Sequence, residues 1–359
     1  MHDLENRSMT RMSPRRSYLP RIAVTVGMAM LMAGCGSTPE ADPTEPTSKV
    51  DAAMTAPSPQ PSSTFVGRFG QVGGWIAYSG VDGIWAVDPA RPNRRIRLSR
   101  GDGDPIAWSS DGTKLLIRRE SPSQVGSGVG ETDLVVFDAD GTETRVTAAD
   151  PTGGSFSPDG SEVVYAAGPW ERSAIYAVSS DGGAPRLILR STRRIGSALA
   201  FTYHPALSPD GTRIAYFDGM FDHSHSLWVV NADGTQRRVL LDDELSDSGH
   251  LRALAWSPDG EWLAFTTDEG LYLVGSDGTG LRRVVSGGFG TAPALQWSPD
   301  GWRIAYLRMG GTCVSRTGED EDLTCEAALS IVNVLGGDEQ VIEGIRMREN
   351  ARIAWNPKL

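Results

Sequence analysis

Cysteine is scarce in this chain, whose 359 residues include only Cys35, Cys313 and Cys325. An odd number of thiols cannot all pair within one chain, so one of the three needs another role. If Cys35 is modified, Cys313 and Cys325 remain, and an oxidising compartment allows them one intramolecular disulfide. The bond would close a loop of about a dozen residues and stabilise it by roughly 3 kcal/mol in the chain-entropy model. Thiol ligation of a metal is the alternative for this pair.

Positive charge is scarce beyond the N-terminus. Five of the 34 basic and two of the 45 acidic residues lie within the first 34 positions, which leaves 29 against 43, a formal net charge of −14 for the rest. An acidic body repels phosphate backbones, which argues against nucleic acid as a partner.

No apolar run reaches the length of a membrane-spanning helix. The run IAVTVGMAMLMAG at 22–34 follows a basic segment and is too short to be a comfortable bilayer anchor, a pattern typical of an export signal. It ends in LMAGC, which resembles the lipobox of bacterial lipoproteins, with Cys35 as the acylated residue. We therefore expect a lipoprotein signal peptide at 1–34, with a plain secretory signal as the alternative. The pair Arg15-Arg16 leaves general and twin-arginine export both open.

Residues 35–65 are rich in Pro, Ser, Thr and Ala and almost lack large apolar groups. Such a segment cannot bury enough surface to fold, so we expect a disordered tether. A flexible chain of this length would place the body on the order of 30 Å from a lipid on Cys35. The expected location is outside the cytoplasm, with the N-terminal lipid in the cell membrane or the outer membrane.

One motif of a turn and a strand recurs five times. Its copies are WSSDGTKLLI from 108, FSPDGSEVVY from 156, LSPDGTRIAY from 207, WSPDGEWLAF from 256 and WSPDGWRIAY from 297. Ser, Pro and Gly at these positions suit a type I turn, and a second turn of Asp-Gly type follows in most copies. Apolar residues alternate between the turns, as in half-buried antiparallel strands. Units of about 40 to 58 residues with four strands each predict an all-β fold, a β-propeller with four-stranded antiparallel blades, rather than a solenoid or a row of sandwiches.

The ends of the repeat region give the number of blades. WIAY at 75–78 matches a second strand without an SPDG turn before it, and RIAWNPKL at 352–359 matches a first strand. The body, residues 66–359, is therefore expected to form six blades, with the ring closed by the C-terminal strand pairing in the N-terminal blade. Tryptophans that recur at one register are expected to pack between blades: Trp108, Trp256, Trp297 and Trp355.

Repeated SPDG followed by an apolar strand resembles the TolB-like β-propeller repeat family, over residues 74–357. Two features depart from that family. The α/β domain that precedes the TolB propeller has no counterpart here, and TolB is soluble in the periplasm whereas this chain has a lipobox-like signal. The family's association with the peptidoglycan-associated lipoprotein is therefore not carried over. Related propellers fused to serine peptidases imply no such activity here, because no G-x-S-x-G elbow follows.

Propeller topology distributes the connections between two faces. The SPDG and Asp-Gly turns share one face, called the turn face below, where turn chemistry explains the Asp residues without a metal. The remaining connections form the loop face, where the copies differ most, with insertions at 121–132, 168–173, 218–226 and 309–328. Binding residues concentrate on variable loops held by a rigid scaffold, so the loop face is the predicted binding site.

The candidate binding residues include all four histidines beyond position 34, the aspartates near them, one loop tryptophan and the acidic stretch between the two cysteines. Imidazoles with carboxylates could hold a divalent metal or supply a general base, or they are solvated loop residues. The tryptophan could anchor a partner or pack, and the acidic stretch suits a basic partner or solubility alone. The candidates are Trp170, His204, His223, His225, His250, Asp242, Asp243, Asp247, Glu319, Asp320, Glu321 and Asp322.

These features favour a non-enzymatic recognition module. We expect a lipid-anchored monomer without a cofactor that displays its loop face to a protein or glycan partner in the cell envelope. One alternative is a metal-assisted hydrolase or lyase that uses the histidines and aspartates, although no motif has fixed catalytic spacing. The other is structural support within an envelope complex.

Overall fold

The computed structural model divides the chain into two units, Met1–Pro46 and Thr47–Leu359, and every described residue belongs to the second. The described residues are 60–61, 69–101, 103–120, 132–147, 150–168, 173–192, 194–195, 198–220, 223–242, 251–287, 294–315, 323–345, 347 and 351–358. Within these ranges the one helix is the 3-10 turn η1 (Phe69–Gln71). No described helix has the length and hydropathy of a membrane span.

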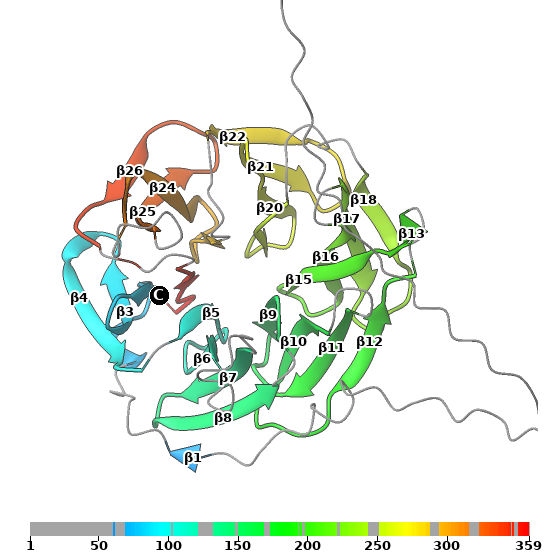
Figure 1. Cartoon of the computed structure of the whole chain (residues 1–359), viewed down its shortest axis with the longest axis horizontal. Helices are drawn as coiled ribbons and strands as arrows, with labels where there is room; N and C mark the ends of the chain where they lie inside the picture. Colours follow the sequence, from blue (N-terminus) through cyan, green and yellow to red (C-terminus); the bar gives the residue numbers. More distant parts are fainter. Residues whose placement is uncertain are drawn as a thin grey trace, which may run out of the picture. The chain divides into compact units, whose positions relative to one another are not determined.

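Six four-stranded antiparallel sheets stand as blades around a common centre, which confirms the predicted fold (Figure 1). From the innermost strand outward, blade 1 is β27 (Ile353–Trp355), β2 (Ile76–Gly80), β3 (Gly83–Asp88) and β4 (Arg91–Ser99), and blade 2 is β5 (Asp104–Trp108), β6 (Lys114–Glu120), β7 (Thr132–Asp138) and β8 (Thr142–Thr147). In the same order, blade 3 is β9 (Gly153–Phe156), β10 (Glu162–Ala167), β11 (Ala174–Ser179) and β12 (Arg186–Arg190), and blade 4 is β15 (Phe201–Leu207), β16 (Arg213–Met220), β17 (His223–Asn231) and β18 (Arg238–Asp242). Blade 5 is β19 (Leu254–Trp256), β20 (Trp262–Thr266), β21 (Gly270–Gly275) and β22 (Arg282–Ser286), and blade 6 is β23 (Leu295–Trp297), β24 (Arg303–Ser315), β25 (Leu323–Asn333) and β26 (Glu339–Ile342).

Two short pieces lie beside the blades. The strands β13 (Arg194–Ile195) and β14 (Ala198–Leu199) form a separate hairpin. The strand β1 (Gln60–Pro61) pairs with β8 as a fifth strand of blade 2. These two residues belong to the segment expected to be a tether, the rest of which lies outside the described ranges.

Side chains within each SPDG turn satisfy one another. In blade 3 the hydroxyl of Ser157 donates to Asp159 at 2.6 Å, and Asp159 also accepts from the N–H of Ser161 at 3.1 Å. The hydrogen bond from Ser157 lowers the pKa of Asp159 to about 2. Gly160 has a φ of 71°, a left-handed conformation that favours glycine. The same Ser–Asp pair recurs in four other blades as Ser109–Asp111, Ser208–Asp210, Ser257–Asp259 and Ser298–Asp300.

Six clusters of buried apolar side chains fill the spaces between neighbouring blades. The recurrent tryptophans take part in them, as predicted. Trp256 is 7% exposed, and its Nε1–H donates to the carbonyl of Ala206 in the preceding blade at 2.9 Å. Trp108 donates in the same way to Ala354. The indoles of Trp108 and Trp256 therefore fill gaps between blades and also satisfy a carbonyl of the preceding innermost strand.

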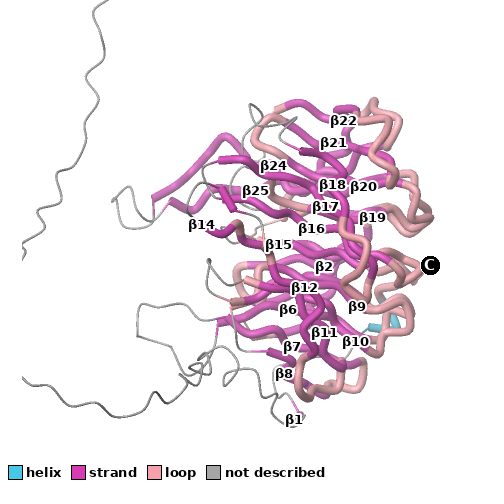
Figure 2. Tube along the Cα trace, turned by 90° about the vertical axis from the view of Figure 1, so that its right-hand side faces the viewer, coloured by secondary structure: helices cyan, strands magenta, loops and turns pink. Residues whose placement is uncertain are grey.

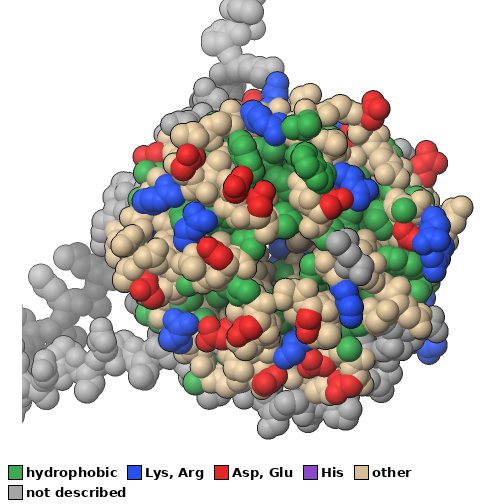
Figure 3. Space-filling view, turned by 180° about the vertical axis from the view of Figure 1, so that it is seen from behind, with side chains coloured by type: hydrophobic (Ala, Val, Ile, Leu, Met, Phe, Trp, Pro, Cys, Tyr) green, Lys and Arg blue, Asp and Glu red, His purple; other side chains and the backbone are tan. Residues whose placement is uncertain are grey.

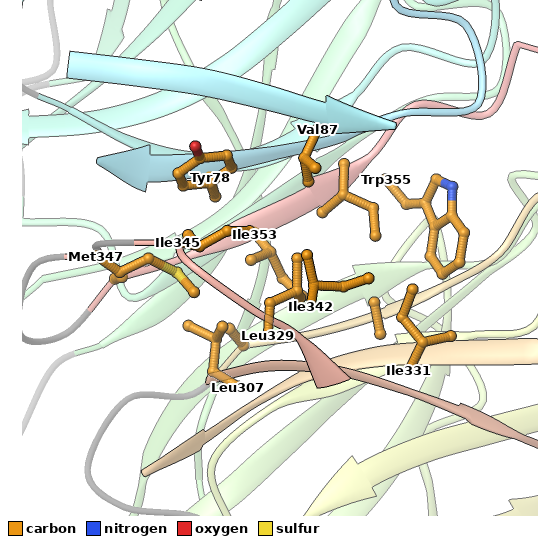
Figure 4. Packing of buried hydrophobic residues seen from close by; sticks show 14 residues of the cluster. Tyr78, Val87, Leu307, Leu329, Ile331, Ile342, Ile345, Met347, Ile353 and Trp355 are labelled. Atoms are coloured by element: carbon orange, nitrogen blue, oxygen red, sulfur yellow. The ribbon is translucent and has the colours of Figure 1, made fainter. Parts of the chain in front are cut away.

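The C-terminal strand closes the ring, as predicted. Strand β27 pairs with β2, with Trp355 opposite Ile76, and the N–H of Asn356 donates to the carbonyl of Trp75 at 2.8 Å. Figure 4 shows how blades 6 and 1 join through an apolar cluster, in which Ile353 meets side chains of blade 6. The two ends of the propeller thus share one sheet, and β27 covers the edge that β2 would otherwise expose.

Candidate functional site

The blades place the turns and the loops on opposite faces, as the topology predicted (Figure 2). Many of the predicted loop-face residues lie outside the described ranges, as does Cys35. These are Trp170, His250, Asp243, Asp247, Glu319, Asp320, Glu321 and Asp322. For His223, Cys313 and Cys325 the structure describes the backbone alone.

His204 and His225 both lie against one buried tyrosine, Tyr203. Nδ1 of His225 is 2.7 Å from the hydroxyl of Tyr203, and the ring centroids of Tyr203 and His204 are 5.5 Å apart. Burial raises the pKa of Tyr203, so its hydroxyl keeps its proton. The loop-face end of blade 4 therefore brings two of the predicted histidines to the same aromatic ring.

Asp242 has a structural partner of its own. Its carboxylate accepts from the hydroxyl of Ser226 at 2.6 Å, across the pairing of β17 with β18. Among the residues that the structure describes, no group of three or more His, Cys, Asp or Glu is placed to hold a metal ion.

His204 faces the central channel because of its backbone. Its φ is 50°, and the register of β15 against β16 shifts between Tyr203 and Ala206, as at a β-bulge. Opposite the ring stands Gly153, at which a Cβ would lie 3.2 Å from Nδ1 of His204. The bulge and the glycine together let an imidazole enter the channel.

The channel around His204 holds a cavity of about 60 Å³, called the inner channel below. All six blades contribute residues from or next to their innermost strands to its lining, among them His204, Gln296 and Arg352. Burial lowers the pKa of His204 to about 3, helped by the charges of Arg352 and Arg118, so the imidazole is neutral at neutral pH. Burial also lowers the pKa of Arg352 to about 9, and Arg118 adds to this while Asp104 opposes it.

A glutamine side chain reaches across the channel. Nε2 of Gln296 in blade 6 donates to the carbonyl of Ile106 in blade 2 at 3.2 Å. Beyond this level the channel widens toward the turn face into a chamber of about 390 Å³, which appears as the hollow at the centre of Figure 3. Its walls include the aromatic residues that end the innermost strands: Trp108, Phe156, Trp256, Trp297 and Trp355.

The turn face also carries a groove of about 300 Å³ between blades 5 and 6, which we call the turn-face groove. Its walls include Trp262, Trp302 and Leu335. Trp302 is 59% exposed and Leu335 is 75% exposed, while Trp262 is partly buried. Hydrophobic side chains accordingly come to the surface on this face (Figure 3). The turn face was expected from the sequence to be scaffold alone, and this surface was not predicted.

Both exposed residues depart from the repeat. The residue after the SPDG glycine is polar in the other copies (Thr113, Ser161, Thr212 and Glu261) but is Trp302 in blade 6. In the second turn Gly336 N–H donates to Asn333 O at 2.9 Å, as Gly234 N–H does to Asn231 O at 2.8 Å. Leu335 therefore takes the position that Asp233 has in blade 4. The sequence signal for this groove is therefore contained in the repeats. At two turn positions that are polar in the other copies, blade 6 has an apolar residue.

No family model matches the chain. Over 152 residues it is 32% identical to the Protein TolB homolog of Chlorobium luteolum, which covers 41% of this chain and 31% of that protein. Over 212 residues it is 26% identical to an uncharacterized protein of Agrobacterium fabrum, which covers 56% of this chain and 64% of that protein. The chain thus spans about a third of the first relative and less than two thirds of the second.

Two solved structures share the fold. A putative TolB from Agrobacterium tumefaciens has a TM-score of 0.51 and 19% identity, with 79% of this chain and 94% of that chain covered. A chain of a Nidogen/Laminin complex has a TM-score of 0.53 and 12% identity, with 79% and 98% covered. At these identities the likeness concerns the architecture alone.

Proposed function

We propose that this chain, whose propeller resembles TolB-like β-propellers, is a non-enzymatic recognition module of the cell envelope that binds a protein partner. A TolB-like propeller fold supports a role in protein interaction. The closed ring of blades provides a rigid body on which turns and loops are held for contact. Cys35 would carry the lipid and residues 35–65 the tether, so that an exported body is displayed from the membrane.

The observation that carries this proposal is the exposure of Trp302 and Leu335 in one groove. Neither side chain is needed by its turn, because the other copies form the same turns with polar residues at these positions. Large apolar side chains exposed together mark interaction surfaces, and buried tryptophans are frequent energetic centres of interfaces. A partner that places an apolar side chain in the groove would bury both residues.

The loop face supplies a second candidate surface, as the sequence analysis predicted. Blade 6 has the strands β24, of 13 residues, and β25, of 11 residues, whereas the second strand of the other blades has at most eight. Cys313 and Cys325 stand directly opposite each other in this hairpin. Opposed residues of antiparallel strands have Cα atoms about 4.5 to 5.5 Å apart, which suits a disulfide. We propose that the bond forms and fixes the hairpin that carries the acidic stretch 319–322.

Capture from an envelope extract of the host tests both surfaces, with residues 66–359 as bait. A Trp302→Thr, Leu335→Asp variant returns both positions to residues that the repeat itself uses, so the turns are preserved. A loop-face variant replaces His223, His225 and the acids at 319–322 with uncharged polar residues. A Thr212→Glu variant is the matched control, since it places the residue of blade 5 into the same turn position of blade 4.

The expected result is a protein, identified by mass spectrometry, that the wild type and the control retain and the Trp302→Thr, Leu335→Asp variant loses. Its purified form should then bind the wild type directly. Loss with the loop-face variant alone would move recognition to the loop face, and a glycan as the retained species would change the partner class. Equal capture by all four baits would contradict recognition through either surface. Metal analysis of the purified body tests the alternative of a metal-assisted hydrolase or lyase.

A further inference from the structure

We propose that the inner channel binds a small oxyanion, such as a carboxylate or a phosphate, on the guanidinium of Arg352. The site lies inside the ring and does not depend on the turn-face groove or on the proposed protein partner.

The described residues of the inner channel and its surroundings carry more positive than negative charge. Arg352 lines the cavity beside His204, and Arg118 is close enough to influence both residues. The carboxylate that acts on Arg352 is Asp104, which already lies 3.6 Å from the guanidinium of Arg118 and accepts from the hydroxyl of Ser79 at 2.7 Å. Among the described residues two guanidiniums therefore share one carboxylate, and an anion would balance the charge of the second guanidinium.

The Arg352 side chain has an N–H donor that no described residue uses. Its Nε is buried and has no hydrogen-bond partner among the described residues, and none of their carboxylates lies within ion-pair distance of this guanidinium. A partly buried cation without a partner is destabilised, and an anion that accepts its hydrogen bonds stabilises it. Arginine presents a planar fork of N–H groups that matches two oxygens of a carboxylate or a phosphate.

The size of the cavity limits the ligand. A volume of about 60 Å³ exceeds the roughly 10–15 Å³ that one water needs, and it suits a group of a few heavy atoms. Gly153 and Gly154 line the same cavity. Any side chain at Gly153 would meet the His204 ring, so the glycine keeps this space open.

The neighbouring polar groups suit an anion. A neutral imidazole keeps one N–H donor, which His204 can offer, and the Gln296 amide has a second N–H besides the one given to Ile106. Together with Arg352 these side chains provide donors from blades 1, 4 and 6 around one small space. A cation is disfavoured here, because among the described charged groups Arg352 and Arg118 outnumber the single carboxylate of Asp104.

The proposal is tested by measuring the unfolding of the full chain with increasing acetate or phosphate at constant ionic strength. The expected result is a rise of the unfolding midpoint that saturates, since a ligand that binds only the folded state stabilises it in this way. Benzenesulfonate, which is too large for the cavity, should give no saturable rise. Arg352→Gln should abolish the saturable part, and Arg186→Gln, an exposed arginine of the outer strand β12, should leave it unchanged.

Arg352→Lys provides a second test in case the Arg352→Gln variant does not fold. This variant keeps the charge but loses the fork, and acetate affinity should fall at least tenfold. Direct observation of ¹³C-acetate by NMR line broadening, reversed by phosphate, provides a readout separate from stability. A stabilisation that is the same for all three anions, or unchanged in both Arg352 variants, would overturn the proposal, as would the lack of any saturable effect.

Discussion

The hydroxyl of Tyr203 and Nδ1 of His225 lie 2.7 Å apart, which joins the innermost strand of blade 4 to its third strand at the loop-face end. Tyr203 is 7% exposed and packs against Phe217, with ring centroids 5.3 Å apart. A buried phenol needs a partner for its O–H, and His225 provides it. This histidine thus has a structural task besides the binding role considered for it from the sequence.

Tyr203→Phe should lower the free energy of unfolding by about 1 kcal/mol, the usual net value of one hydrogen bond. His225→Leu should cost more, because it leaves the phenol hydroxyl without this partner. Urea unfolding of both variants and of the double variant gives the coupling energy between the two side chains. Strict additivity of the two single changes would show that the pair contributes nothing to stability.

The neutral imidazole of His204 predicts a dependence of stability on pH. Its pKa is about 3 in the folded chain against 6.5 as the ordinary value, so between these limits the unfolded chain binds a proton that the folded chain does not. Stability should therefore fall as the pH is lowered from 6.5 toward 3, by at most about 1.4 kcal/mol per pH unit from this group.

His204→Asn is the matched variant, since asparagine tolerates a positive φ well. Urea unfolding at pH 7, 6 and 5 in buffers poor in small oxyanions should give a steeper loss of stability for the wild type than for this variant. Parallel curves for the two proteins would mean that His204 is protonated in the folded chain in this range.

The hairpin of blade 6 predicts a disulfide between Cys313 and Cys325, which stand opposite each other in the pairing of β24 with β25. Peptide mapping of exported protein without reduction should recover the two cysteines in one cross-linked peptide. Cys313→Ser should lower the free energy of unfolding by roughly 3 kcal/mol in the chain-entropy model. A Cys313→Ser, Cys325→Ser variant as stable as the wild type would contradict a stabilising bond.

The fold was predictable because its information is local. Ser157, Asp159 and Gly160 form their turn from their own side chains and backbone, and the same chemistry recurs along the chain. Once the turns and the alternating strands are located, the matching ends at 75–78 and 352–359 leave six blades and a closed ring.

The sites were less predictable because they depend on what the ring brings together. Arg352 and Arg118 meet only when the C-terminal strand enters blade 1 beside blade 2, and Gln296 reaches Ile106 across 190 positions of sequence. The orientation of His204 toward the channel depends on a positive φ and a β-bulge, and no residue pattern in the sequence predicts either of them. Trp302 was different, since its departure from the polar residues of the other copies was visible in the sequence.

Because β27 closes the ring, we expect that a chain ending at residue 350 will not form a stable propeller. Its removal exposes the edge of β2 and deletes Ile353 and Trp355, which are 2% and 5% exposed. Full burial of one large apolar side chain contributes roughly 1.5–3 kcal/mol, and domains are stable by only about 5–15 kcal/mol. We expect loss of cooperative unfolding and association of the truncated chain through the open edge, measured by circular dichroism and size-exclusion chromatography.

A synthetic peptide of residues 349–359 should restore the monomeric fold in a concentration-dependent manner, whereas the same peptide with Trp355→Ala should restore it much less effectively. A truncated chain that remains monomeric and unfolds cooperatively without the peptide would show that five intact blades suffice.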